Sequence, residues 1–405
     1  MASKFYNDKQ GIIYYNGTLT NELQTTYQTI SAEFTQTLDQ TLIKEPSDYD
    51  LTITRFQISS QAIPYWICPI QINQANPNLT PYGIQLQYTS ASGNSLTSDY
   101  TYLIWQNDIA TPFYGANIKV QELATGYYFS YNKQDFIEMF NNAMETALTN
   151  FRFDFITAYP ADPNPPIQGA RELGGQPNPD FPFLSWNEGL SKFQMYFSIR
   201  TYTGANPLQI YTNNILYPLI QFPSTNTDFN RPSNVSLAYR IEVPIDDNYY
   251  VPTYYLAYPE MTKIGYIVVY SDHDTRGVFS PLHRIIVSSN TLPTSSEIVQ
   301  PSSSPFFLAN PSYISQTVPS KIVSDFEPDM FSTNINNRDF IQYNQSVNNS
   351  RLISLQNSNV SIDKIDIKIY WSDFNNNVYP LVLFAGCSMD IKLAFVPRIY
   401  LISEP

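Results

Sequence analysis

The sequence is poor in charged residues, cysteine and histidine, and each shortage excludes a class of protein. Charged residues make up 14% of the 405 positions, against about a quarter in ordinary soluble domains. Two cysteines without metal-type spacing exclude a disulfide scaffold. No apolar run approaches the roughly 18 residues that a membrane-spanning helix needs. Glycine-rich phosphate loops, the Gly-X-Ser-X-Gly elbow and His-Glu-X-X-His are also missing, so common catalytic classes lose support.

The charge balance and the first residues exclude two further classes. The net charge is −13, whereas a protein that wraps nucleic acid needs a basic surface. We therefore expect no direct nucleic-acid binding. Residues 1–10 lack the apolar core of a signal peptide. This favours a protein that assembles inside a cell rather than one secreted by the ordinary route.

Aromatic residues are abundant where charges are scarce. The chain contains 32 Tyr and 25 Phe, and Tyr is favoured at interfaces because its ring is apolar and its hydroxyl is polar. A surface with little charge is also poorly protected against association. Aromatic residues equally suit strand positions, so the same composition is typical of a β protein. We expect both, and the low charge favours a protein that self-associates.

The clearest secondary-structure signal lies in residues 362–397. Apolar and polar residues alternate strictly from Ile365 to Trp371, and again from Met389 to Phe395, with a polar turn and an apolar run between them. Alternation with a period of two is typical of half-buried strands. A chain that ends in consecutive patterned strands is usually completing the sheet of a sandwich or barrel.

Further strands are predicted along the whole chain, and only one helix. Residues 49–58 are a strand whose apolar parity changes at Thr54 and Arg55, which indicates a β-bulge or burial on both faces. Apolar residues at helical spacing predict a helix near residues 133–150, covering one face of a sheet. Strands are also expected around 84–88, 100–104, 183–186, 193–197, 208–211, 237–243, 264–270, 284–288, 322–326 and 352–355. The class is mainly β.

Composition suggests the domain organisation. Residues 1–45 have little core apart from one short strand predicted at 12–15, and are interpreted as an N-terminal arm that orders against the same chain or a neighbouring one. Residues 160–182 hold seven prolines and are interpreted as a long loop or boundary. Residues 46–159 are then the first part of a core, 160–290 an inserted β-rich domain and 291–405 the closing strands.

Three groups of residues resemble catalytic or metal-binding sites. The Asp-His-Asp-Thr-Arg run at 272–276, with His283 nearby, has metal-binding composition but reads better as a turn. Asp325 and Glu327 lie two positions apart, about 7 Å on one strand face, near the separation of glycosidase acids. Cys68 has no histidine beside it in the sequence and is expected to be a buried thiol. We expect no catalytic, cofactor-binding or metal-binding residue among them.

Several short segments resemble the minor capsid proteins of virophages and polinton-like viruses. They are PSDYDLTITRFQI at 46–58 with Ile-Pro at 63–64, SDFE at 324–327, KIDIKIYWSDF at 364–374, YPL at 379–381 and KLAF at 392–395. The resemblance implies a jelly-roll β-sandwich, here with an inserted β-rich domain and one covering helix. It also implies a structural penton or vertex subunit, self-assembled as a homopentamer beside the major capsid protein in an icosahedral virion. No enzymatic activity and no cofactor are implied.

Two other functions fit the same composition. A viral attachment or glycan-binding β-sandwich would use Tyr-rich loops such as residues 246–255. A glycan-cleaving enzyme would use Asp325 and Glu327 in a cleft. Closed rings of purified protein would favour the capsid subunit, and binding on a glycan array would favour the attachment module.

The jelly-roll interpretation also makes a prediction about the two cysteines. If residues 49–58, running on to Cys68, are the first strand and residues 388–396 the last, the two strands are antiparallel neighbours. Cys68 and Cys387 would then lie on the same side of one sandwich, unbonded. The alternative is two unrelated buried thiols.

Overall fold

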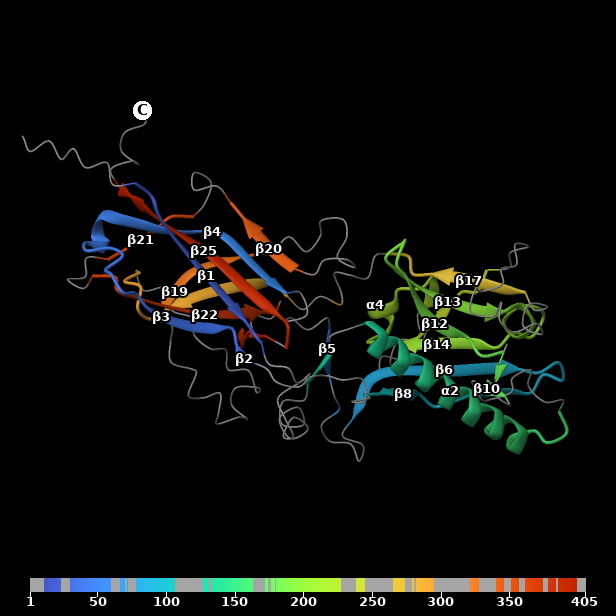
Figure 1. Cartoon of the computed structure of the whole chain (residues 1–405). Coiled ribbons are helices and arrows are strands. Elements are labelled where there is room, and N and C mark those ends of the chain that lie inside the picture. The colour runs from blue at the N-terminus through green and yellow to red at the C-terminus, as the bar shows by residue number, and fades with distance from the viewer. Residues whose placement is uncertain are drawn as a thin grey trace, which may run out of the picture. The chain divides into compact units, whose positions relative to one another are not determined.

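The structure is a computed structural model that forms two compact units (Figure 1). It describes residues 11–22, 30–59, 66–69, 71, 78–105, 127–130, 133–162, 172–173, 176–178, 180–226, 238–244, 265–273, 279, 282–294, 321–327, 340–345, 351–356, 361–373, 378–383 and 385–398. The first unit contains β1 to β4 and β18 to β25, and the second contains β5 to β17. In sequence, the second unit is therefore inserted between β4 and β18.

The first unit is a jelly roll of two antiparallel sheets. One sheet has the order β1-β25-β4-β20, with β21 also paired to β4, and the other has the order β3-β22-β18-β19, with β23 also paired to β22. In each sheet an early strand of the chain pairs with a late one, β1 and β4 with β25 and β3 with β22, as in a double Greek key. The bounds are β1 Ile13–Thr20, β3 Glu33–Thr37, β4 Tyr49–Ser59, β18 Arg284–Ser289, β19 Lys321–Phe326, β20 Phe340–Asn344, β21 Ile353–Ser354, β22 Lys364–Ser372, β23 Val378–Pro380 and β25 Ser388–Pro397. The short β2 (Ile30–Ser31) pairs with β24 (Val382–Leu383), and a 3-10 turn, η1 (Pro46–Asp48), precedes β4.

The predicted parity change in residues 49–58 is a β-bulge. In the β4–β25 ladder, Arg55 faces Lys392 and Ile53 faces Leu393, so Thr54 has no partner of its own. The extra residue reverses the faces, which is why Ile53 and Phe56 are both buried. Residues 49–53 are in addition buried on both faces. Both explanations offered by the sequence therefore apply to β4.

The described part of residues 1–45 belongs to the jelly roll itself. β1 pairs along its whole length with β25, from Ile13 opposite Phe395 to Thr20 opposite Ser388, and β3 pairs with β22. β1 and β3 begin the two sheets, so these residues order against the same chain as strands of its core. Their polar composition hid this role, because edge strands need fewer apolar residues than central ones.

The second unit is β-rich and has its own core. Its main sheet has the order β15-β16-β14-β6-β7, with β8 also paired to β6, and a smaller sheet has the order β12-β13-β17. The pairs β5–β9 and β10–β11 complete the described strands. The bounds are β5 Trp66–Pro69, β6 Leu79–Thr89, β7 Ser95–Thr97, β8 Thr101–Ile104, β9 Tyr127–Ser130, β10 Glu172–Leu173, β11 Gln176–Pro177, β12 Phe183–Asn187, β13 Lys192–Ser198, β14 Gln209–Asn213, β15 Ser224–Asn226, β16 Ala238–Ile241 and β17 Tyr266–Tyr270. Two single-turn helices, α3 (Ile199–Tyr202) and α4 (Tyr217–Ile220), connect these strands.

The predicted helix is α2 (Lys133–Ala158), which packs on β6, β8 and β12 of the second unit (Figure 1). It extends beyond residue 150 because Phe151 and Phe155 continue its buried stripe. Asn141 fixes the helix to β12, since its side chain donates to the carbonyl of Leu184 at 3.0 Å and accepts from the amide of Leu184 at 2.8 Å. This covering helix agrees with the fold predicted from the sequence.

The inserted unit begins earlier than the expected boundary at residue 160. β6, β8 and α2, which the sequence analysis assigned to the jelly-roll core at 46–159, belong to the second unit. The proline-rich stretch at 160–182 lies inside that unit rather than at its edge. The assignment failed because an amphipathic strand has the same pattern whichever sheet it joins.

The two cysteines lie in different units. Cys68 is in β5 and packs in the core of the second unit, whereas Cys387 immediately precedes β25 of the jelly roll. The prediction that both lie on one sandwich is therefore wrong, because the chain leaves the jelly roll after β4. Its premise, antiparallel pairing of residues 49–58 with 388–396, is confirmed.

A buried carboxylate fixes the loop that follows β18. Asp366 of β22 is 6% exposed. It accepts hydrogen bonds from the hydroxyls of Ser289 and Thr291, both at 2.7 Å, and from the amides of Asn290 and Thr291 at 2.9 and 2.8 Å. Burial by itself would raise the pKa of Asp366, but the hydrogen bonds from Ser289, Thr291 and the two amides outweigh it and lower the pKa.

Replacing this carboxylate should weaken the jelly roll and change its acid sensitivity. Asp366→Asn is expected to lower the free energy of unfolding by about 1.5–3 kcal/mol, the usual contribution of hydrogen bonds to a charged group. The pKa of Asp366 is lower in the folded chain than in the unfolded chain, so its charge contributes its full stabilisation above the unfolded-state pKa of about 3.9. That stabilisation is lost as the pH falls through the folded-state pKa. Urea unfolding at neutral and acidic pH tests this. The control is Asp363→Asn, at an exposed position before β22, which should leave stability nearly unchanged. If Asp366→Asn and the wild type lost stability equally as the pH falls, the stabilising role of the Asp366 charge would be contradicted.

Candidate assembly surface

The jelly roll has two lateral sides, and they differ in shape. β1 and β3 are edge strands on one side, while β19 and the β20–β21 pair form the edges of the opposite side. In the part of the chain that the structure describes, β1 pairs with β25 alone and β19 pairs with β18 alone. Backbone groups along these outer edges are therefore free of ladder bonds within the described sheets, the usual starting point for association through strands.

The β1–β3 side is closed by contacts between the two sheets. The Tyr15 hydroxyl donates to Gln36 Oε1 at 2.7 Å. The Phe34 ring lies so close to Gly17 that a Cβ atom at Gly17 would come within 2.5 Å of Phe34 Cζ. Tyr14, next to these residues, is 46% exposed, and Lys392 Nζ lies 4.4 Å from the centroid of its ring. This side therefore presents a packed edge with an exposed tyrosine.

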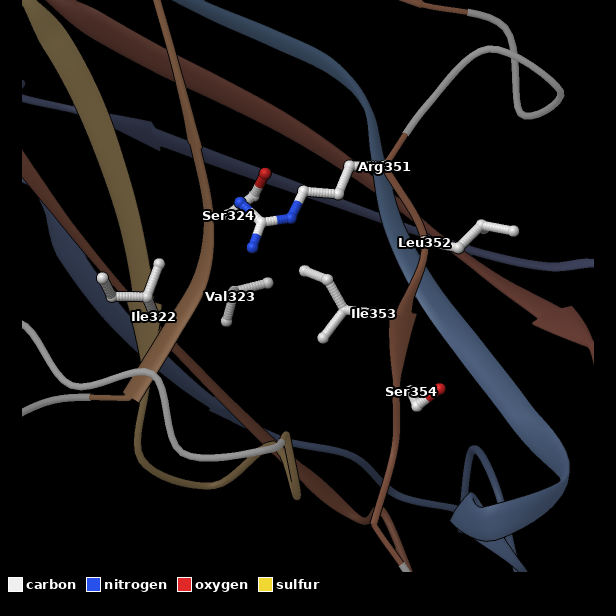
Figure 2. A pocket seen from close by; sticks show the side chains of 7 residues that line it. All are labelled: Ile322, Val323, Ser324, Arg351, Leu352, Ile353 and Ser354. Atoms are coloured by element: carbon white, nitrogen blue, oxygen red, sulfur yellow. The ribbon is translucent and has the colours of Figure 1, made fainter.

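The opposite side is hollow, and we call the hollow the β19–β21 slot. It has a volume of about 200 Å³ and is lined by residues 322–324 of β19 and by residues 351–354, which include β21. Val323 and Ile353 point toward each other across the slot, and Arg351 extends over it toward Ser324 (Figure 2). At the other end of β19, Phe326 stacks on Tyr343 of β20 with ring centroids 4.3 Å apart. The slot is thus a hollow of mixed lining, in which Ser324, Arg351 and Ser354 lie beside aliphatic side chains.

At the rim of the slot, Asp325 lies between two arginines. Asp325 Oδ2 lies 3.1 Å from Arg284 Nη1, and Asp325 Oδ1 lies 3.1 Å from Arg351 Nη1. The Asp325 carboxylate therefore forms ion pairs with two guanidinium groups. The Arg351 side chain is 57% exposed, so its charge faces solvent.

The two acids suggested by the sequence, Asp325 and Glu327, both contact basic side chains. Asp325 is held by the two arginines, and Glu327 Oε1 lies 3.3 Å from His283 Nε2. Arg284 and Arg351 could not be assigned to this cluster from the sequence, because they are far from Asp325 along the chain. The pairing of β18 with β19 places Arg284 and Asp325 on the same face of the sheet, and this pairing is visible only in the structure.

The other suggested residues fall elsewhere. Asp272 and His273 follow β17 in the second unit, and residues 274–276 lie outside the described part of the chain. Cys68 is fully buried, and burial raises the pKa of its thiol well above the ordinary value, which disfavours the nucleophilic thiolate. The Tyr-rich stretch at 246–255 is outside the described residues.

The described residues show neither a metal-binding cluster nor a membrane-spanning helix. Among them, no cluster of three or more His, Cys, Asp or Glu side chains is arranged to hold a metal ion. The described helices include none that is both long and apolar enough to cross a membrane.

The fold of the first unit is shared by a known class of protein. Jelly rolls with this strand order are typical of viral capsid and lectin domains. The chain belongs to the family of the Sputnik minor capsid protein V18/19, which it matches over residues 13–397. It is therefore a minor capsid protein, a structural component of a virion, as the resemblance of its short segments indicated.

Individual relatives and solved structures agree with the family. A protein of Sputnik virophage, the uncharacterized protein V18, is 29% identical over 117 residues, which are 29% of this chain and 70% of that protein. A chain in the 3.5 Å cryo-EM structure of the Sputnik virophage superposes with a TM-score of 0.68 at 20% identity, covering 96% of this chain and 99% of that one. The crystal structure of the mavirus penton protein gives a TM-score of 0.54 at 14% identity with the same coverage. At these identities the two structures establish a shared fold.

Proposed function

We infer that this minor capsid protein assembles into a closed pentameric ring that occupies the vertices of an icosahedral capsid. The main support is the similarity of nearly the whole chain, jelly roll and insertion together, to the mavirus penton protein. A vertex of an icosahedron has fivefold symmetry, so a subunit that fills it is expected to form a pentamer. Each subunit would contact its neighbour through two different surfaces, as any cyclic ring above a dimer requires.

The composition of the chain supports the same proposal. With 14% charged residues and 32 Tyr, its surface has little electrostatic repulsion and many amphipathic side chains. The ring would adjoin the major capsid protein. A structural role requires no cofactor and no catalytic step, consistent with family members that are capsid proteins.

The mass of the purified protein tests the proposed ring. Native mass spectrometry should detect a species of five times the 46.4 kDa chain mass, and its proportion should fall on dilution because the ring is held by noncovalent contacts. Two-dimensional class averages from electron microscopy should show fivefold rings. A protein that remains monomeric at high concentration, with no ring in its images, would refute the proposal.

A further inference from the structure

The main sheet of the second unit has one face in the core and one face turned away from it. Ile84, Leu86 and Leu103 point into the core, where they pack with residues of α2. Residues of the alternate parity on β6, β8, β14 and β16 therefore lie on the opposite face, which we call the outer face. None of these residues belongs to the core cluster that the described residues form.

Two tyrosines lie close against the outer face because the strand beneath them lacks a side chain. Gly83 of β6 is opposite Tyr102 of β8. A Cβ atom at Gly83 would lie 3.0 Å from Tyr100 Cδ1, 3.2 Å from Tyr102 Cε1 and 3.1 Å from Asn213 Nδ2. The rings of Tyr100 and Tyr102, whose centroids are 6.2 Å apart, are thus held against the backbone of the sheet, and both residues are half-buried. Because packing already fixes the rings, a ligand that stacks on them costs little side-chain entropy.

Amide side chains lie beside these rings on the outer face. The Tyr211 hydroxyl lies 2.7 Å from the Oε1 atoms of both Gln87 and Gln209. A phenol has one proton, so this hydroxyl donates to one amide and accepts from the NH2 group of the other. Gln85, opposite Tyr211, donates from Nε2 to the carbonyl of Ser98 at 2.7 Å. The sheet therefore holds several amide donors and acceptors in fixed positions.

Charge and exposure favour a small polar ligand over a protein partner. Among the described strands of this sheet, Arg240 is the one charged residue, and its Nη2 lies 2.9 Å from Glu242 Oε1. Ile104, at 43%, is the one large hydrophobic residue of these strands that is well exposed. A stable protein contact needs an apolar centre and about 800 Å² on each partner. The outer face offers aromatic rings and neutral hydrogen-bonding groups instead.

We propose that the outer face binds a neutral oligosaccharide, with a sugar ring stacked on Tyr102 and sugar hydroxyls bonded to the amides of Gln85 and Gln87. The apolar C–H face of a pyranose matches an aromatic ring, and its rim of hydroxyls matches amides, which both donate and accept. Gln85 is diagonal to Tyr102 across β6 and β8, roughly 7–8 Å away, so one disaccharide can contact both. A charged sugar is not selected, because Arg240 is already paired with Glu242. This binding site does not rest on the proposed ring.

A glycan array probed with the full chain tests the proposal. The chain should bind neutral oligosaccharides of hexoses or N-acetylhexosamines. In titration calorimetry with the neutral oligosaccharide that gives the strongest array signal, Tyr102→Ala should raise the dissociation constant about tenfold. Gln87→Ala should raise it as well, because a sugar hydroxyl loses its partner. Tyr270→Ala is the control and should bind as the wild type does, since Tyr270 is exposed on β17 of the other sheet.

Each outcome supports or overturns the site. A chain that binds no neutral glycan on the array, or binds sialylated glycans alone, would overturn it. A Tyr102→Ala variant that keeps the thermal unfolding of the second unit and binds the glycan like the wild type would also overturn it. If Tyr102→Ala does not fold, Gln87→Ala decides in the same way. A Tyr102→Ala variant that loses the ring in native mass spectrometry, in a chain that binds no glycan, would make the outer face a protein contact. Because ring formation is measured separately, the proposed function and this inference can fail independently.

Discussion

Deletion of residues 1–45 is expected to abolish the cooperative unfolding of the jelly roll while the inserted unit still unfolds as a unit. The deletion removes β1 and β3, the first strand of each sheet. It also removes the buried side chains Tyr15 and Ile43, which are 7% and 3% exposed. Burying a large apolar side chain contributes roughly 1.5–3 kcal/mol, and the half-buried Phe34 adds to the loss. The sum is comparable with the total stability of a typical domain, about 5–15 kcal/mol.

Calorimetry of the truncated chain would measure this effect. The inserted unit should keep its transition, because its core runs from Trp66 to Phe279 and includes no residue from β1 or β3. Deletion of residues 1–10 alone, which leaves both strands in place, is the matched control and should retain the jelly-roll transition. A chain that lacks residues 1–45 but keeps that transition would restore the interpretation of this segment as an N-terminal arm outside the core.

Phe56→Ala is expected to lower the free energy of unfolding of the jelly roll by about 3–5 kcal/mol, the usual cost of removing a buried phenylalanine. Phe56 lies on β4, is 0% exposed, and meets Phe326 of the facing sheet with ring centroids 5.3 Å apart. It therefore connects β4 and β19, one strand from each sheet, by side-chain packing. The cavity left by the ring would lie between the sheets, which can collapse around it only in part.

Denaturant titrations of the jelly-roll transition would measure the loss. Phe153→Ala removes the same atoms from α2, but Phe153 is 71% exposed, so its effect should stay within about 0.5 kcal/mol. A loss below 1 kcal/mol for Phe56→Ala would mean that the two sheets do not pack through this residue. It would then contradict the facing arrangement of β4 and β19.

The sequence predicted those parts of the fold whose residues are buried in a regular pattern. β22 and β25 alternate strictly because one face of each lies in the core, and α2 repeats its apolar residues at helical spacing for the same reason. Even the bulge at Thr54 was visible, because inserting one residue moves every later side chain to the other face. Where buried residues recur at a regular spacing, the sequence itself shows which element they belong to.

The parts that could not be predicted depend on distant partners. β1 and β3 are polar edge strands, and β20 has no clear pattern, so their pairing with β25, β22 and β4 is not written in their own residues. The start of the inserted unit was misplaced for the same reason, since β6 and β8 look like strands of either sheet. The slot was also invisible, because it needs Arg351, Asp325 and Ile353 together, which only the folded chain provides.

The most direct test of the vertex assignment is an icosahedral reconstruction of the virion that contains this protein. Density at the fivefold axes is expected to fit five copies of the jelly roll of β1 to β4 and β18 to β25, as the vertex assignment requires. A different chain at the fivefold axes, with this protein located only between the larger capsomers, would contradict it.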